Sequence, residues 1–170
     1  EGSFSLMVNP VNDAPEIVHE SDTLEVFEDD SLDIYMSISD LDDDLLLLTA
    51  ISDTTSISLF ISDDTVLTII PDNNWNGIFR LDGFVTDSSG LSDTTVIIVD
   101  VLPVNDHPEI TSIPDTSINE DESLSIGISG SDIDGDNLIY SVGEIDHFEM
   151  YVFSDGDSLL MLPESNWFGS

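Results

Sequence analysis

Residues 31–38 read Ser31-Leu32-Asp33-Ile34-Tyr35-Met36-Ser37-Ile38 and decide the fold class. Every second side chain of this stretch is apolar, and the side chains between them are polar or amphipathic. Successive side chains of a β-strand point to opposite faces, so this alternation predicts one strand with a buried face and a solvated face.

The same β signals recur on both sides of this strand. Clusters of Asp, Asn, Ser and Gly separate the candidate strands, and no stretch has a helical period. About seven strands in roughly 92 residues are typical of an all-β, Greek-key β-sandwich of the immunoglobulin-like or cadherin-like type. The further strands expected are Glu16–His19, Leu24–Phe27, Leu45–Ile51, Ser56–Phe60, Val66–Ile70, Phe79–Thr86 and Thr94–Leu102.

The chain repeats itself. The heptapeptide Val11-Asn12-Asp13-Ala14-Pro15-Glu16-Ile17 recurs as Val104-Asn105-Asp106-His107-Pro108-Glu109-Ile110, an offset of 93 residues. Several matches in one order and at one spacing indicate tandem copies of a structural unit. Three further matches have an offset of 92: residues 28–32 with 120–124, 39–42 with 131–134, and 74–77 with 166–169.

These repeats predict the domain organisation. Residues 1–13 are expected to be the last strand and linker of a preceding repeat, and residues 14–106 a complete repeat. Residues 107–170 are expected to be a second repeat that is truncated at its C-terminus, without two of its strands and frayed for that reason.

The charge of the chain excludes several classes of partner. It has 37 acidic residues and one basic residue, Arg80, for a formal net charge of −36. Nothing in it can neutralise the phosphates of nucleic acid or an anionic membrane surface. There is no cysteine for disulfides, and no apolar run approaches the ~18 residues of a membrane helix, so no direct membrane insertion is expected. Cations are the natural counterpart of this charge.

Acidic residues gather in two turn-like stretches with alternate spacing, Asp40, Asp42 and Asp44 in one and Asp132, Asp134 and Asp136 in the other. Calcium takes about 6–8 oxygen ligands, and carboxylates that alternate in a turn can converge on one ion. An EF-hand is excluded, because its sixth and twelfth positions, counted from Asp132, hold Asn137 and Gly143. The three histidines are scattered and do not predict a zinc site.

Two further elements accompany these acids. Asn105 and Asp106 precede Pro108, which favours an extended backbone before it and marks a boundary between units. Glu28 comes just before the strand that begins near Ser31. Strand ends collect at the two poles of a sandwich, so a linker, Glu28 and an acidic turn of the next unit are expected to meet.

The linker and the acidic turns together resemble bacterial cadherin-like tandem repeats of large surface adhesins. The resemblance is carried by residues 104–108, by 131–142 and by Phe84-Val85-Thr86-Asp87-Ser88-Ser89-Gly90. It implies calcium between consecutive repeats. Its ligands would be Glu28, Asn105, Asp106, Asp132 and Asp134 at one junction, Asn12, Asp13, Asp40 and Asp42 at the preceding junction, and Glu120 at a following one.

The chain departs from the cadherin pattern in its linker and in mid-domain. Cadherins begin the linker with Asp where this chain has Pro103, and their mid-domain Asp-Arg-Glu ligands are missing, with Asp72 as a candidate substitute. One or two ions per junction are therefore expected. Asp87 lies in a stretch that resembles the family pattern, and its alternative role is to cap its own turn.

These features predict a structural module and not an enzyme, because a repeated unit also repeats its candidate residues. The expected function is a calcium-rigidified spacer or adhesive stalk at a cell surface or outside the cell. Its expected partners are other repeats of the chain, together with surface proteins or glycans. One alternative is a glycan- or protein-binding module, for which Tyr35 and Phe60 are the candidate aromatic platform. Another is a passive acidic spacer. Trp75 and Trp167 are expected to pack in the core or its turns.

Overall fold

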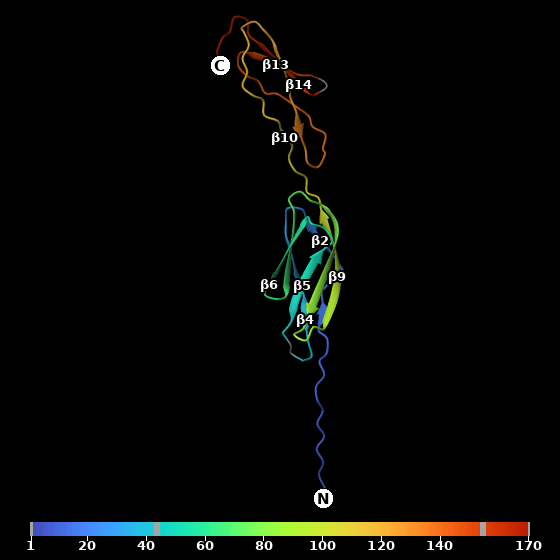
Figure 1. Cartoon of the computed structure of the whole chain (residues 1–170). Helices are drawn as coiled ribbons and strands as arrows, with labels where there is room; N and C mark the ends of the chain where they lie inside the picture. Colours follow the sequence, from blue (N-terminus) through green and yellow to red (C-terminus); the bar gives the residue numbers. More distant parts are fainter. Residues whose placement is uncertain (1, 43–44, 154–155, 170) are drawn as a thin grey trace. The chain divides into compact units, whose positions relative to one another are not determined.

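Strands form the regular secondary structure of the computed structural model, which describes residues 2–42, 45–153 and 156–169 (Figure 1). The chain divides into unit 1, Glu1–Val104, and unit 2, Asn105–Ser170. Within the described ranges, no helix has the length and hydropathy that a membrane crossing requires.

The strands of unit 1 form a β-sandwich. A four-stranded sheet has the order β2-β9-β8-β5, a three-stranded sheet has the order β3-β7-β6, and β1 pairs with β4. All pairs are antiparallel except β2 with β9, which is parallel. The strands are β1 (Glu16–Val18), β2 (Thr23–Phe27), β3 (Leu32–Tyr35), β4 (Ser37–Ser39), β5 (Leu47–Ser52), β6 (Ile57–Ser62), β7 (Val66–Pro71), β8 (Gly77–Thr86) and β9 (Ser92–Leu102). The predicted all-β, immunoglobulin-like sandwich is confirmed.

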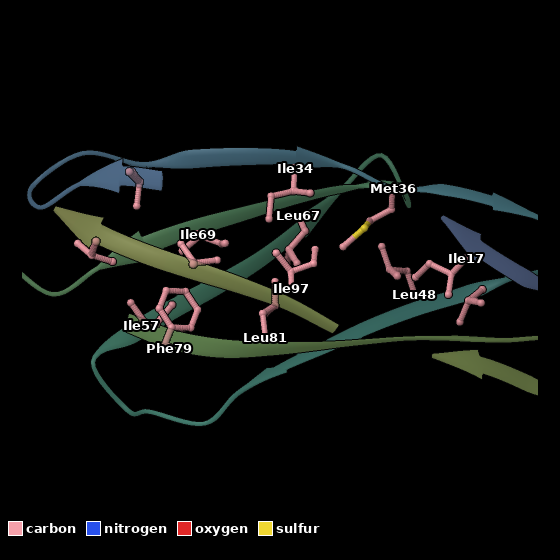
Figure 2. Close-up of a cluster of buried hydrophobic side chains, with 14 residues drawn as sticks. Ile17, Ile34, Met36, Leu48, Ile57, Leu67, Ile69, Phe79, Leu81 and Ile97 are labelled. Atoms are coloured by element: carbon pink, nitrogen blue, oxygen red, sulfur yellow. The ribbon is translucent and has the colours of Figure 1, made fainter. Parts of the chain in front are cut away.

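The core of unit 1 lies between its two larger sheets (Figure 2). Leu67 and Ile69 from β7 and Ile97 from β9 have no exposed surface, and Phe79 from β8 is 2% exposed. Side chains that alternate along each strand supply this core, as period-two patterning requires. Trp75 packs against it edge-on to Phe79, with ring centroids 6.2 Å apart, which confirms core packing as its role.

The segment predicted as one strand over residues 31–38 is two strands, β3 and β4, with Met36 between them. β3 pairs with β7, whereas β4 pairs with β1, so the chain changes sheets at this residue. The backbone N–H of Met36 donates to Thr65 O at 2.8 Å, and its side chain is buried. The alternation is therefore correct although the single strand is wrong, because a strand that passes from one sheet to another keeps its buried face.

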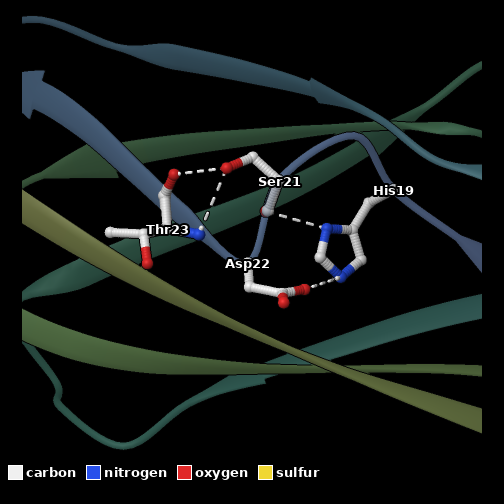
Figure 3. Close-up of polar contacts among 4 residues, drawn as sticks. All are labelled: His19, Ser21, Asp22 and Thr23. Carbon is white, nitrogen blue, oxygen red and sulfur yellow. Dashed lines mark hydrogen bonds and ion pairs between the residues drawn. The ribbon is translucent and has the colours of Figure 1, made fainter.

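The loop between β1 and β2 is closed by local polar contacts (Figure 3). His19 Nδ1 lies 2.8 Å from Ser21 O, and the Ser21 hydroxyl donates to Thr23 O at 2.7 Å. His19 Nε2 also lies 3.7 Å from an Asp22 carboxylate oxygen. These contacts give His19 a structural part in the turn that leads into β2.

Unit 2 repeats part of the unit 1 architecture. β10 (Glu109–Ile110) pairs with β12 (Gly130–Ser131), as β1 pairs with β4. β11 (Leu124–Gly127), β14 (Ser158–Pro163) and β13 (Phe148–Val152) form a sheet that matches β3-β7-β6. Residues 105–153 and 156–169 contain no counterpart of the four-stranded sheet, and two of their apolar side chains, Ile128 and Leu159, are as little as 8% exposed.

Candidate metal centres

An acidic pole forms in unit 1 where the linker meets the turn after β4. The backbone N–H of Asp13 donates to Asp42 Oδ2 at 2.8 Å, and the N–H of Asp42 donates to Asp40 Oδ1 at 2.7 Å. The Asn12 side-chain amide donates to Asp13 O at 2.8 Å. These bonds hold four predicted ligand residues, Asn12, Asp13, Asp40 and Asp42, in one place. Asp44, the third acid of this stretch, lies outside the described residues.

Unit 2 has a second acidic pole with the same bonds. The N–H of Asp106 donates to Asp134 Oδ2 at 2.7 Å, and the N–H of Asp134 donates to Asp132 Oδ1 at 3.0 Å. The Asn105 side-chain amide donates to Asp106 O at 2.8 Å. Asp136 adds a backbone bond to Asp132 Oδ1 at 3.1 Å. The linker and the acidic turn therefore meet in the same way in each unit.

Asp87, for which the sequence left open a place in the family pattern or a cap of its own turn, contacts the pole of unit 1. Its Oδ1 accepts bonds from the N–H groups of Ser89 and Leu91 at 2.9 and 2.8 Å, which is a turn cap. Its Oδ2 accepts a bond from the Asn12 amide at 2.8 Å, and the residue is 6% exposed. The turn 87–90 was visible in the sequence, but its contact with the linker depends on the fold.

Burial alone raises the pKa of the Asp87 carboxyl, but the bonds from Asn12, Ser89 and Leu91 outweigh burial and hold this pKa below its usual value of 3.8. A carboxylate with a lowered folded-state pKa stabilises the fold above the unfolded value, and that stabilisation is lost as the pH falls through the folded value.

Asp87→Asn is therefore expected to lower the melting temperature by several degrees at pH 7, because the charged acceptor of these bonds is lost. The difference in melting temperature between the variant and the unchanged chain should narrow as the pH falls below 3.8, because Asp87 itself then becomes protonated. Calorimetry from pH 7 to pH 2 measures the gap directly. A gap that stays constant over this range would show that the charge of Asp87 contributes nothing.

Among the residues that the structure describes, one carboxylate oxygen of the unit 1 pole has no hydrogen-bond partner. Asp40 Oδ2 is buried and accepts no hydrogen bond within the described residues. A buried anionic oxygen is costly unless a donor or a cation meets it. The only Lys or Arg of the sequence is Arg80, and its guanidinium binds Asp82 at 2.7 Å. The donor set of the pole, carboxylate and amide oxygens around an orphaned oxygen, fits a hard cation such as calcium.

Glu28 follows β2 and is 3% exposed. Its Oε1 accepts a bond from the N–H of Val104 at 2.7 Å, and its Oε2 accepts one from the Asn76 amide at 3.0 Å. Its own N–H donates to Leu102 O at 2.9 Å. Glu28 therefore fastens the end of β2 to the residues that follow β9, at the place where the chain runs on into its second linker.

Residues 12–100 match the family of the bacterial Ig domain, which is more than half of the chain. The chain belongs to this family. Domains of this kind are typically non-catalytic modules. The match is coarser than a cadherin-like repeat, so the resemblance drawn from the linker stays a prediction. No curated protein matches this bacterial Ig protein.

Solved structures resemble the bacterial Ig chain at low identity. An endo-fucoidan hydrolase of glycoside hydrolase family 107 is 18% identical, with a TM-score of 0.47, 94% of this chain covered and 25% of the hydrolase. The SGBP-B protein of the Bacteroides ovatus mixed-linkage glucan utilization locus is 16% identical, with a TM-score of 0.43 and coverages of 94% and 42%. Domains 4–9 of the surface layer protein SbsC are 11% identical, with a TM-score of 0.40 and coverages of 95% and 28%. The chain thus spans between 25% and 42% of these structures.

The remaining candidate residues of the bacterial Ig chain take no part in the hydrogen bonds described above for the acidic poles. Tyr35 on β3 and Phe60 on β6 are 70% and 58% exposed, on the two strands that flank β7. Asp72, the candidate substitute ligand, is exposed in the turn after β7, and its N–H donates to Ser56 O. Glu120, the unit 2 counterpart of Glu28, is exposed.

Proposed function

We propose that this bacterial Ig chain is a calcium-binding structural and adhesive module of a larger extracellular or cell-surface protein. The observation that carries the proposal is the repetition of the acidic pole: two units with different sequences between their motifs make the same three hydrogen bonds among linker and turn. A solvated acidic surface does not require such repetition.

Calcium would bind the first pole through Asp40 Oδ2 and the side chains of Asn12, Asp13 and Asp42, with Asp87 adjacent. It would bind the second pole through Asn105, Asp106, Asp132 and Asp134. The bound ion would supply positive charge that relieves repulsion among the carboxylates and fixes the linker to the turn.

Glu28 is proposed as a further ligand at the second pole. The support is the course of the chain: the carboxylate of Glu28 is bonded to the N–H of Val104, and Asp106 is two residues further along. A ligand from the preceding unit would let calcium stiffen the connection between consecutive repeats. That is the property a spacer or adhesive stalk needs.

Calcium is expected to stabilise the 170-residue chain beyond any effect of ionic strength. At a Kd of about 10⁻⁴ M, about 1 mM calcium contributes roughly 1.4 kcal/mol per site, or about 5–10 °C in melting temperature for a unit of this size. Thermal unfolding in chelator, in calcium chloride and in sodium chloride of matched ionic strength measures this. Equal stabilisation by sodium would replace the proposal with the passive acidic spacer.

Asp40→Asn provides the site-specific control, because it removes the orphaned anionic oxygen with little change of shape. The variant should lose the calcium-dependent rise in the melting temperature of unit 1. In chelator it should be at least as stable as the unchanged chain. Glu20→Gln removes the same charge from an exposed loop and should keep the calcium gain. Small-angle scattering of the same samples tests stiffening. A stiffened chain should have a narrower distribution of end-to-end lengths in calcium than in chelator.

A further inference from the structure

The strand β6 lies at one edge of the sheet β3-β7-β6, so only its β7 side is paired within the described residues (Figure 1). The backbone N–H of Asp72 donates to Ser56 O at 2.8 Å, which marks these two residues as a hydrogen-bonded pair of the β6-β7 ladder. Bonded and non-bonded pairs alternate along an antiparallel ladder. It follows that the N–H and C=O groups of Ile57, Leu59 and Ile61 point away from the sheet.

The edge formed by β6 lacks the usual protection of an edge strand. A row of outward backbone groups is a template for a further strand, and proteins usually guard it with charged residues or proline. Three other end strands of the chain carry an acid, namely Glu25 in β2, Asp33 in β3 and Glu149 in β13. β6 has the sequence ISLFIS, without charge or proline.

The neighbourhood of β6 is uncharged as well. β5, the strand that precedes β6 and ends the four-stranded sheet, has the sequence LLTAIS. Residues 45–62 contain a single charged residue, Asp53, in a chain with 37 acids. Its carboxylate accepts a bond from the N–H of Arg80 at 3.0 Å. A second acidic molecule can therefore approach this side of unit 1 with the least repulsion.

Apolar side chains are exposed on both faces of β6. Phe60 is 58% exposed on the outer face of the sheet, and Ile61, whose side chain points to the opposite face, is 40% exposed. A strand that pairs with β6 would cover part of both side chains. Backbone bonds would then supply affinity, and the alternate side chains would supply specificity.

The residues of β6 are self-complementary about Leu59. When two copies of this strand lie antiparallel with Leu59 opposite Leu59, Ile57 of each copy lies opposite Ile61 of the other. These are the residues whose backbone groups point outward, so each pair can exchange two hydrogen bonds. On the outer face, Ser58 lies opposite Phe60, and the two Phe60 rings become diagonal neighbours.

We propose that β6 of one copy of the chain pairs antiparallel with β6 of a second copy. The pairing joins the sheets β3-β7-β6 of the two copies into one continuous sheet. Each copy uses the same strand, so the contact is isologous and closes at a dimer.

The register centred on Leu59 also keeps acids apart. Beyond the ends of β6, Asp53 falls beside Thr65 of the second copy, and Asp63 falls beside Thr55. No acid therefore lies opposite another acid in the contact itself. The net charge of −36 on each copy still opposes association at longer range, so sodium chloride should strengthen the dimer by screening.

Sedimentation velocity of the 170-residue chain in chelator, between about 1 and 500 µM, tests the proposal without any contribution from calcium. The dimer fraction should rise with protein concentration and with sodium chloride. Phe60→Asp should lower the association constant by about tenfold or more, because it places two carboxylates side by side in the contact. Ser58→Asp, an exposed substitution that removes no apolar surface, should also weaken the dimer.

Tyr35→Asp is the matched control. Tyr35 is 70% exposed on the same face of the same sheet, but it lies on β3, the opposite edge strand. The Tyr35→Asp variant should associate like the unchanged chain. Circular dichroism of the dilute variants confirms that each one is folded.

Hydrogen exchange of the unchanged chain locates the contact independently of any variant. The amides of Ile57, Leu59 and Ile61 should become protected as the dimer forms. The N–H of Met36 donates to Thr65 O, so the outward amides of β3 are those of residues 33 and 35, and their exchange should not change.

Three results would overturn the proposal. The first is a chain that stays monomeric over the whole range of protein and salt concentrations. The second is equal association of the Phe60→Asp and Tyr35→Asp variants. The third is a dimer in which the outward amides of β6 stay unprotected, because another surface would then be responsible.

Discussion

Phe79→Ala is expected to lower the free energy of unfolding of unit 1 by about 3–5 kcal/mol, or about 12–40 °C in melting temperature. The ring is 2% exposed in the closed core and meets Trp75 edge-on. Its removal therefore leaves a cavity and also deprives a second aromatic side chain of its contact. Against the 5–15 kcal/mol typical of a domain, this loss is large enough to unfold much of unit 1 near physiological temperature.

Ile78→Ala is the matched control for this prediction. Ile78 is the neighbour of Phe79 on β8, but its side chain points outward and is 69% exposed. An exposed substitution of this kind usually changes stability by less than about 0.5 kcal/mol. Urea unfolding followed by circular dichroism compares the two variants. Equal losses would mean that β8 does not present alternate faces to core and solvent, and the sandwich would be wrong.

The fold was predictable from the sequence because its two main signals are local or repeated. Alternation needs only neighbouring residues, and it correctly identified Ile34 and Met36 as buried. The change of sheets at Met36 was not predictable, since it depends on which strands the two halves pair with.

The candidate site was likewise predictable from the sequence only in part. The motifs 12–13 with 40–42, and 105–106 with 132–134, were found from spacing, and each pair is joined by hydrogen bonds. Asp87 as a partner of Asn12 was not predicted, because 75 residues separate them and only the sandwich brings them together. The orphaned oxygen of Asp40 is likewise a consequence of packing, and no pattern of residue types marks it.

Glu28→Ala is expected to lower the free energy of unfolding of unit 1 by about 2–3 kcal/mol in chelator. The buried carboxylate accepts bonds from Val104 and Asn76, and bonds to a charged group contribute about 1.5–3 kcal/mol when their partner has little access to water. Glu28→Gln keeps one carbonyl acceptor in the same place, so its loss should be about 1 kcal/mol. Urea unfolding in chelator measures both losses.

The effect of calcium on stability distinguishes the two roles of Glu28, which are calcium ligand and cap for the end of β2. A ligand needs the negative charge of the carboxylate, whereas a cap needs only a hydrogen-bond acceptor. If Glu28 is a ligand, both variants lose the same calcium increment, roughly 1.4 kcal/mol at about 1 mM, despite their unequal losses in chelator. Glu25→Gln removes an equal charge from the exposed face of β2 and should keep the increment. A full increment in Glu28→Gln would leave Glu28 as a cap for the end of β2, and calcium would then have to bind each pole without a ligand from the preceding unit.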